Sequence, residues 1–141
     1  MGLENIDVYY FAILIAAIAS MIIGGLWYSP ILFGNIWIKL SGFTNKEKDK
    51  AKQRGMAKFY IIALIGSLVT SFVLAHFVKY MGITSIGGAL QLAFWIWVGF
   101  IATVMLGTVI WEGKPVKLYL INAVYQLVSF SVAAVILTLW A

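Results

Sequence analysis

Amide and hydroxyl side chains interrupt the apolar sequence at intervals that fit one face of a helix. Asn122, Gln126 and Ser129 follow one another at spacings of four and three residues, which places them together on such a face. These groups can hydrogen-bond a neighbouring helix or a polar solute, but a serine without an adjacent base is a weak nucleophile. Hydroxyl side chains near the middle of other long apolar segments complete a candidate polar path. It is made of Ser67, Thr70, Ser71, Thr103 and Gln126. Two interpretations stay open: hydrogen bonds between helices, or a path or small-ligand site.

A second group of polar and aromatic residues is expected at one membrane face, where it could form a cytoplasmic-side pocket. Its members are Trp27, Tyr28, Ser29, Asn35, Glu112 and Asn122. The alternative is that residues 27–37 are only the turn from one span into an interfacial helix, and that Glu112 pairs with a neighbouring lysine. A proton-carrying or substrate-contacting role for Glu112 also stays open.

The sequence carries no recognisable catalytic centre. It has no cysteine and a single histidine, His76, so a thiolate or multi-histidine metal site is excluded. No glycine-rich loop carries the lysine of a phosphate-binding motif. We therefore expect no enzyme activity, no metal and no cofactor, and an enzyme that acts on lipid ranks third among the functions considered.

Four long uncharged runs must position these residues: 8–28, 59–78, 80–111 and 118–140. About 20 apolar residues at roughly 1.5 Å each cross a hydrocarbon layer roughly 30 Å thick. The composition agrees, since 63% of the 141 residues are hydrophobic and only 11% are charged. Backbone groups in lipid need internal partners, which favours helices. We predict an all-α, polytopic membrane protein: one domain, 1–141, with a compact bundle of four transmembrane helices at 8–28, 59–78, 88–111 and 118–140.

Basic residues cluster in two of the connections. Seven lie in loop 29–58 and two, Lys114 and Lys117, in loop 112–117, whereas Lys79 is the one basic residue on the other side. This bias predicts that loops 29–58 and 112–117 are cytoplasmic, that the N- and C-termini are outside, and that the membrane is a prokaryotic inner membrane. The net charge of +5 does not indicate nucleic acid, because these residues flank spans. They are expected to contact anionic lipid headgroups.

The segment after the first span is apolar but too short to cross the membrane. Ser29 is expected to cap a helix that Pro30 begins. We predict an interfacial or re-entrant amphipathic helix over 31–42, with its relation to the membrane left open. A charged helix is then expected from 46 to 58, continuous with the second span.

Small residues recur at every fourth position in three spans, a pattern that lets helix backbones approach closely. The stripes are Ala12, Ala16, Ser20 and Gly24; Ala63, Ser67, Ser71 and Ala75; and Gly99, Thr103 and Gly107. They either hold one bundle together or include a self-association face. We expect a protein that acts through helix association, as a homo-oligomer or as an accessory subunit of a protein partner. The alternative is a small transporter or channel with a polar path between helices or protomers.

The stretch 25–37 reads GLWYSPILFGNIW and resembles the signature of the domain of unknown function 1761 family. Residues 97–100 (WVGF) and 122–128 (NAVYQLV) are also similar to that family, so the resemblance covers nearly the whole chain. It implies a compact four-span membrane protein. It implies no established activity, and no catalytic or binding role is carried over from it.

Overall fold

The computed structural model describes residues 8–41 and 56–140 of the chain. The regular elements of this part are all helical: α1 (Tyr10–Trp27), α2 (Gly34–Ser41), α4 (Met56–Tyr80), α5 (Ile86–Trp97), the π-helix η2 (Val98–Ala102), α6 (Thr103–Met105), α7 (Gly107–Ile110) and α8 (Val116–Leu139). Four stretches are long and apolar enough to cross a membrane: Tyr10–Trp27, Ala57–Tyr80, Ile86–Ile110 and Val116–Leu139. The predicted all-α, four-helix membrane fold is confirmed, and the chain is an integral membrane protein.

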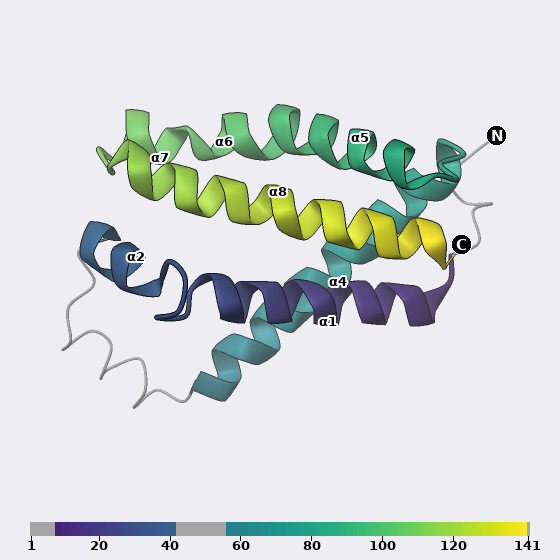
Figure 1. Cartoon of the computed structure of the whole chain (residues 1–141), viewed down its shortest axis with the longest axis horizontal. Helices are drawn as coiled ribbons and strands as arrows, with labels where there is room; N and C mark the ends of the chain where they lie inside the picture. The colour runs from purple at the N-terminus through teal and green to yellow at the C-terminus, as the bar shows by residue number, and fades with distance from the viewer. Residues whose placement is uncertain (1–7, 42–55, 141) are drawn as a thin grey trace.

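Helix α8 lies at the centre of this bundle (Figure 1). Helix α1 packs along one side of it and α5 along the other, while α4 crosses α1 and α8 at an angle. Alanines are prominent in the buried core, where Ala12, Ala16, Ala89, Ala93 and Ala134 are each at most 1% exposed. Small side chains bring helix axes together where lipid removes the hydrophobic driving force between helices.

The crossing of α4 leaves the first half of this helix apart from the bundle. Its buried side chains all lie in the second half, at Ser71, Leu74, Ala75 and Val78. Between residues 57 and 66 every side chain but that of Leu64 is exposed. A helix that crosses its neighbours at an angle separates from them with distance from the crossing point, so a hollow forms beside the first half of α4.

The third span is divided into α5, η2, α6 and α7 instead of forming one regular helix. Carbonyl groups at this irregularity accept side-chain hydrogen bonds. The Tyr119 hydroxyl of α8 donates to the Ala102 oxygen at 2.7 Å, and the Thr103 hydroxyl donates to the Gly99 oxygen at 2.7 Å. Such partners are needed within a membrane, because lipid offers none to an irregular backbone.

The chain turns sharply between α1 and α2. Two backbone bonds hold the turn, from Phe33 N to the Trp27 oxygen and from Gly34 N to the Ser29 oxygen, each 2.9 Å. The prediction that Ser29 caps a helix begun by Pro30 is wrong: α2 begins at Gly34, and the Ser29 hydroxyl donates to the Leu26 oxygen of α1 at 2.7 Å. Residues 28–33, which the pattern assigned in part to the helix, form the turn instead, and α2 then packs against α8.

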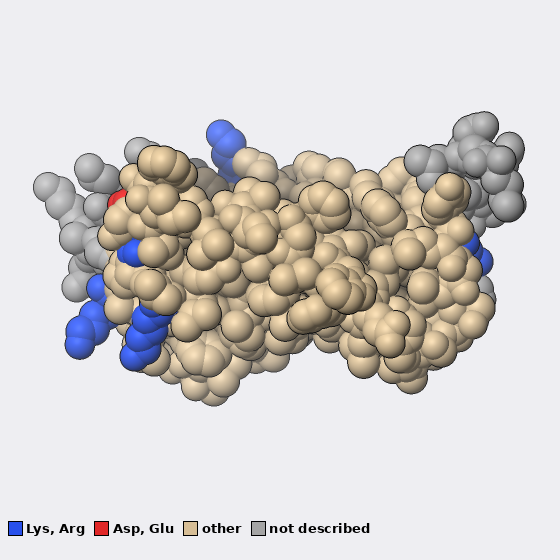
Figure 2. All heavy atoms as spheres, turned by 90° about the horizontal axis from the view of Figure 1, so that it is seen from above, with Lys and Arg blue, Asp and Glu red and all other residues tan. Residues whose placement is uncertain are grey.

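Basic side chains gather at the end of the bundle where α2, α7 and the start of α8 lie, as Figure 2 shows. Lys79 lies in the last turn of α4 at the other end, which is also where α1 begins and α8 ends. There the rings of Phe11 and Trp140 lie 5.9 Å apart. The charge asymmetry of the sequence therefore corresponds to two ends of one bundle. The lysines of 46–52, Arg54, and most of the helix predicted over 46–58 lie outside the described residues.

Candidate functional site

A polar recess lies between α1, α4 and α8, where α4 separates from its neighbours. Its volume is about 240 Å³. Gln126 lines it and comes ten residues after the start of α8, which places the amide about 15 Å into a hydrocarbon layer roughly 30 Å thick. The residues that line the recess are Ser20, Ala63, Gly66, Ser67, Thr70, Tyr125, Gln126, Ser129 and Phe130. Six of these nine side chains carry a hydrogen-bonding group near the middle of the membrane.

Several of these polar side chains have no partner in the part of the chain that the structure describes. Within residues 8–41 and 56–140, no hydrogen bond involves the side chains of Ser20, Ser67, Thr70 or Gln126. Ser20 is nonetheless only 8% exposed. An amide or hydroxyl without a partner is unfavourable in an apolar medium by roughly 1–3 kcal/mol on protein mutational scales. The recess therefore favours an occupant that can hydrogen-bond.

The structure gathers three of the five residues predicted for the polar path. Ser67, Thr70 and Gln126 line the recess together. Ser71 is 1% exposed and belongs to the packed part of α4. Thr103 is exposed on the third span and bonds to its own helix. It does not reach the recess, because the third span packs against α8 on the side away from α1.

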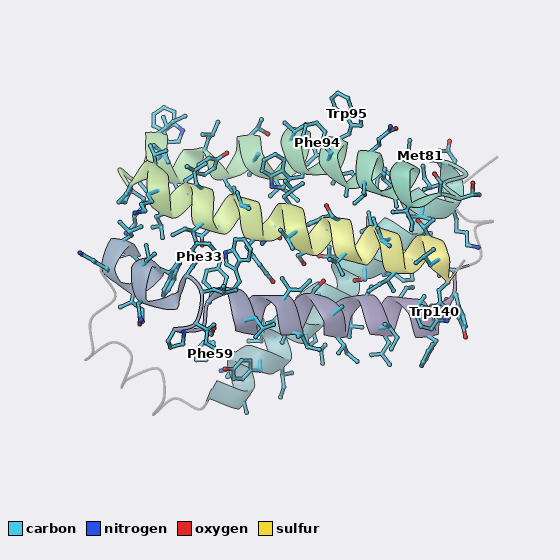
Figure 3. All side chains as sticks on the ribbon, in the orientation of Figure 1. Phe33, Phe59, Met81, Phe94, Trp95 and Trp140 are labelled. Carbon is cyan, nitrogen blue, oxygen red and sulfur yellow. The ribbon has the colours of Figure 1, made fainter. Side chains whose placement is uncertain are left out.

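An aromatic cluster lies directly after this recess, at the end of α1. Trp27 Nε1 donates to the Ile121 oxygen at 3.0 Å, and the Tyr28 hydroxyl donates to Asn122 Oδ1 at 2.7 Å. Ring contacts complete the cluster: Trp27 with Phe33 (4.8 Å between centroids), Tyr28 with Tyr125 (5.4 Å) and Tyr28 with Trp37 (6.0 Å). Phe33 lies between the turn and α8, as Figure 3 shows. The cluster joins α1, the turn, α2 and α8.

The Tyr28 hydroxyl, just past the end of α1, stays protonated at neutral pH. Burial first, and the neighbouring Tyr125 second, raise the pKa of Tyr28 to about 12. A neutral phenol donates one hydrogen bond, and Asn122 accepts it. This bond links the residue that follows α1 to α8.

The six residues predicted for the cytoplasmic-side pocket do not all come together. Trp27, Tyr28 and Asn122 belong to the aromatic cluster. Ser29 bonds back to α1, while Asn35 and Glu112 are exposed. No hydrogen bond within the described ranges joins Asn35 or Glu112 to the cluster. The gathered part is a packed contact between helices, and the polar group that faces a hollow is Gln126.

An apolar groove adjoins the polar recess between α4 and the third span. Its volume is about 450 Å³. It is lined by Val69, Thr70, Val73, Leu74, Phe77, Ile96, Phe100, Ile101 and Phe130. Thr70 and Phe130 line both hollows, so the two are neighbours along α4. No Asp, Glu, Lys, Arg or His is among the residues that line either hollow.

Two polar members of the recess, Ser20 and Tyr125, were not predicted as site residues, and Ser129 was predicted only as a face neighbour of Gln126. Ser20 belonged to a small-residue stripe, which hid its polar character behind a packing role. The Tyr125 hydroxyl donates a hydrogen bond to the backbone oxygen of Ser20 at 3.3 Å. Gly24 beside it is a further signal, since an added Cβ would lie 2.9 Å from the Tyr125 hydroxyl. A small residue opposite a large polar one could have paired the first and last spans.

No three His, Asp or Glu side chains within the described ranges lie close enough to hold a metal ion. His76 Nδ1 lies 2.7 Å from the Phe72 oxygen of its own helix. The described residues thus offer hydrogen-bonding and apolar surfaces for a functional site.

A family model described as Protein of unknown function (DUF1761) matches residues 11–138. No curated protein and no solved structure matches the chain. The match runs from the first span into the last, and its description assigns no activity.

Proposed function

The chain belongs to the family described as Protein of unknown function (DUF1761), and from its geometry we propose that it acts without catalysis, by associating its helices with a second copy of itself. The role of an accessory subunit, in which a partner membrane protein replaces the second copy, uses the same surface. The proposal rests on the small-residue stripe of the third span, which internal packing leaves uncovered at Gly99 and Thr103.

The stripe of α1 is largely buried within the bundle, and so is the second half of the α4 stripe, whereas Ala63 and Ser67 in its first half line the polar recess. On α1, Ala12 and Ala16 are at most 1% exposed and Ser20 is 8% exposed. On α4, Ser71 and Ala75 are likewise buried. These buried positions hold α1, α4 and α8 together and are not free to contact another molecule.

The stripe on the third span is different. Gly99 and Thr103 are both exposed, and a Cβ added at Gly99 would meet no atom within 4 Å. The Thr103 hydroxyl already bonds to the Gly99 oxygen, so this surface presents no unsatisfied polar group. Exposed apolar side chains alone mean little in lipid, but small residues whose polar groups are already hydrogen-bonded let a second helix approach closely. We call the Gly99–Thr103 surface the association face.

We propose the orientation that the charge bias predicts. The end of the bundle with most of the lysines faces the cytoplasm of a prokaryotic cell, and both termini lie outside. The basic loops contact anionic lipid headgroups. Figure 2 supports this orientation, because basic side chains gather at one end of the described molecule.

The polar recess favours a second candidate function. A small transporter or channel needs hydrogen-bonding groups at the middle of the membrane, and Ser67, Thr70 and Gln126 supply them. Its path would pass the recess, and Gln126→Leu would reduce flux of a small uncharged solute in proteoliposomes. Unchanged flux in that variant would remove this candidate.

Cysteine cross-linking in native membranes tests the association directly, because the chain has no cysteine of its own. Thr103→Cys should form a disulfide-linked dimer upon mild oxidation. Ile62→Cys is the matched control and should give little dimer, because Ile62 is exposed on α4 but belongs to no small-residue stripe and lines neither hollow.

The second test is Gly99→Leu in the Thr103→Cys background. The added side chain meets open space within one chain, so the fold should persist, but it would hold a second helix away and reduce the cross-linked fraction about tenfold, which corresponds to roughly 1.4 kcal/mol. An undiminished dimer in Gly99→Leu, or equal dimer from Ile62→Cys, would refute the association face.

A further inference from the structure

The polar recess and the apolar groove lie side by side along α4, share Thr70 and Phe130, and differ sharply in chemistry. We propose that together they bind one uncharged amphiphilic lipid taken from the bilayer, with its hydrogen-bonding head in the recess and its hydrocarbon tail in the groove. The site is separate from the association face, since Gly99 lines neither hollow, and the inference does not depend on self-association.

The hydrogen-bonding capacity of the recess indicates what the head must carry. The Gln126 amide offers two donors and an acceptor, and each hydroxyl offers a donor and an acceptor. The side chains of Ser20, Ser67, Thr70 and Gln126 have no hydrogen bond within the described residues. Ser20 matters most here, because it is more than nine-tenths buried and still lines the hollow. A head with hydroxyl or carbonyl oxygens would complete these groups.

The absence of charge from the lining indicates that the head is neutral. No ionisable Asp, Glu, Lys, Arg or His lines either hollow. An unpaired charge near the middle of a membrane is unfavourable by several kcal/mol. A phospholipid keeps its charged headgroup at the interface, about 15 Å from Gln126. An uncharged lipid can reach that depth, and its hydrogen bonds to the recess replace those that it gives up.

The groove fixes the other half of the ligand. All but one of its lining side chains, Thr70, are apolar, and about 450 Å³ is available between α4 and the third span. Water could fill the recess but would not enter the apolar groove, which a separate acyl chain of the bilayer would then have to cover. A purely hydrocarbon molecule would fill the groove and leave the Gln126 amide without a partner. Only an amphiphile satisfies both surfaces with one molecule.

Gly66 gives the proposal a clean test. It lines the recess, it is exposed, and a Cβ added there would meet no atom within 4 Å. Gly66→Leu should therefore fill the recess without disturbing the fold. Gly99→Leu is the matched control, because it too adds a leucine to open space in a span but lines neither hollow.

The probe is diacylglycerol with a photoreactive diazirine in one acyl chain, added to the full chain in lipid nanodiscs. Phosphatidylglycerol and a headless hydrocarbon, both with the same diazirine chain, serve as the charged and apolar comparisons. After irradiation, mass spectrometry should locate the diacylglycerol label on α4, η2 and α8. Gly66→Leu and Gln126→Leu should each reduce that labelling about tenfold, and Gly99→Leu should not change it. Circular dichroism confirms that each variant keeps its helices.

Three outcomes would overturn the proposal. The first is labelling of the groove by the headless hydrocarbon or by phosphatidylglycerol as strongly as by diacylglycerol. The second is diacylglycerol labelling that Gly66→Leu leaves unchanged, and the third is no labelling of the groove at all, as expected if water or a second copy occupies the recess. Failure here leaves the association face untouched, because Gly99→Leu tests that face alone.

Discussion

The sharpest structural prediction concerns Gly34, at the turn between α1 and α2. A Cβ added at this position would overlap the Tyr28 oxygen and lie 2.7 Å from the Ser29 carbonyl carbon. Both neighbours are backbone atoms, which cannot move aside by rotating a bond. Gly34→Ala should therefore open the turn, even though alanine is the smallest possible addition.

The size of the effect follows from the hydrogen bonds that the open turn would lose. They are the bonds from Phe33 N to the Trp27 oxygen, from Gly34 N to the Ser29 oxygen, and from the Tyr28 hydroxyl to Asn122. At a net value of about 1 kcal/mol each, losing two or three of them lowers the free energy of unfolding by about 2–3 kcal/mol. That is a change of roughly 30- to 140-fold in the unfolding equilibrium.

Unfolding in mixed micelles with increasing dodecyl sulfate, followed by far-ultraviolet circular dichroism, measures this difference. Gly25→Ala is the matched control, because a Cβ there meets no atom within 4 Å and alanine favours the helix by up to about 1 kcal/mol. Equal midpoints for Gly34→Ala and Gly25→Ala would refute the claim that the turn is closed by backbone contact.

Two further predictions concern the stability of single-residue variants, and a third concerns the orientation of the protein in the membrane. Tyr28→Phe removes one hydrogen bond to Asn122 and should lower the free energy of unfolding by about 1 kcal/mol in the same titration. The control is Tyr60→Phe, at an exposed position on α4, which should not change that free energy. Equal free energies of unfolding for the two variants would show that the bond contributes nothing. Gln126→Leu removes an amide that has no partner within the described residues, so stability should stay equal or rise, and a loss would reveal an internal partner. For the orientation, a membrane-impermeant maleimide should label Thr84→Cys in intact cells and Lys114→Cys only after lysis; the reverse pattern would invert the molecule.

The sequence predicts the spans well because hydrophobicity and length decide them almost alone. The runs predicted at 59–78 and 118–140 correspond to helices at Met56–Tyr80 and Val116–Leu139. The third span shows the limit of this reasoning. Its hydropathy is continuous, yet Val98–Ala102 adopts a π-helix whose carbonyls are satisfied by Thr103 and by Tyr119 from another helix. A single-span pattern does not reveal a partner seventeen residues away from Ala102.

Predicting the candidate sites required knowing which helix faces pack against one another. The depth of a residue in the membrane does not give this information. Ser67, Thr70 and Gln126 share a recess because α4 crosses α8 at an angle. Thr103 has a similar depth but lies on the far side of α8. Depth follows from counting residues at about 1.5 Å each, whereas the rotation of each helix is set by packing among small residues that many arrangements would satisfy.

In a membrane, an exposed surface needs a partner only if lipid chains cannot satisfy it. By this criterion the exposed surfaces of this protein are of three kinds. Exposed leucines and phenylalanines need no partner, because lipid chains cover them as well as protein would. The association face has no unsatisfied polar group either. Its proposed role in self-association therefore depends on how closely a second backbone could approach Gly99. The recess is the exception: lipid chains cannot hydrogen-bond Gln126, and the described chain does not. Water, a second copy or an uncharged lipid must do so, and the apolar groove beside it favours the lipid, because only that occupant covers both surfaces at once.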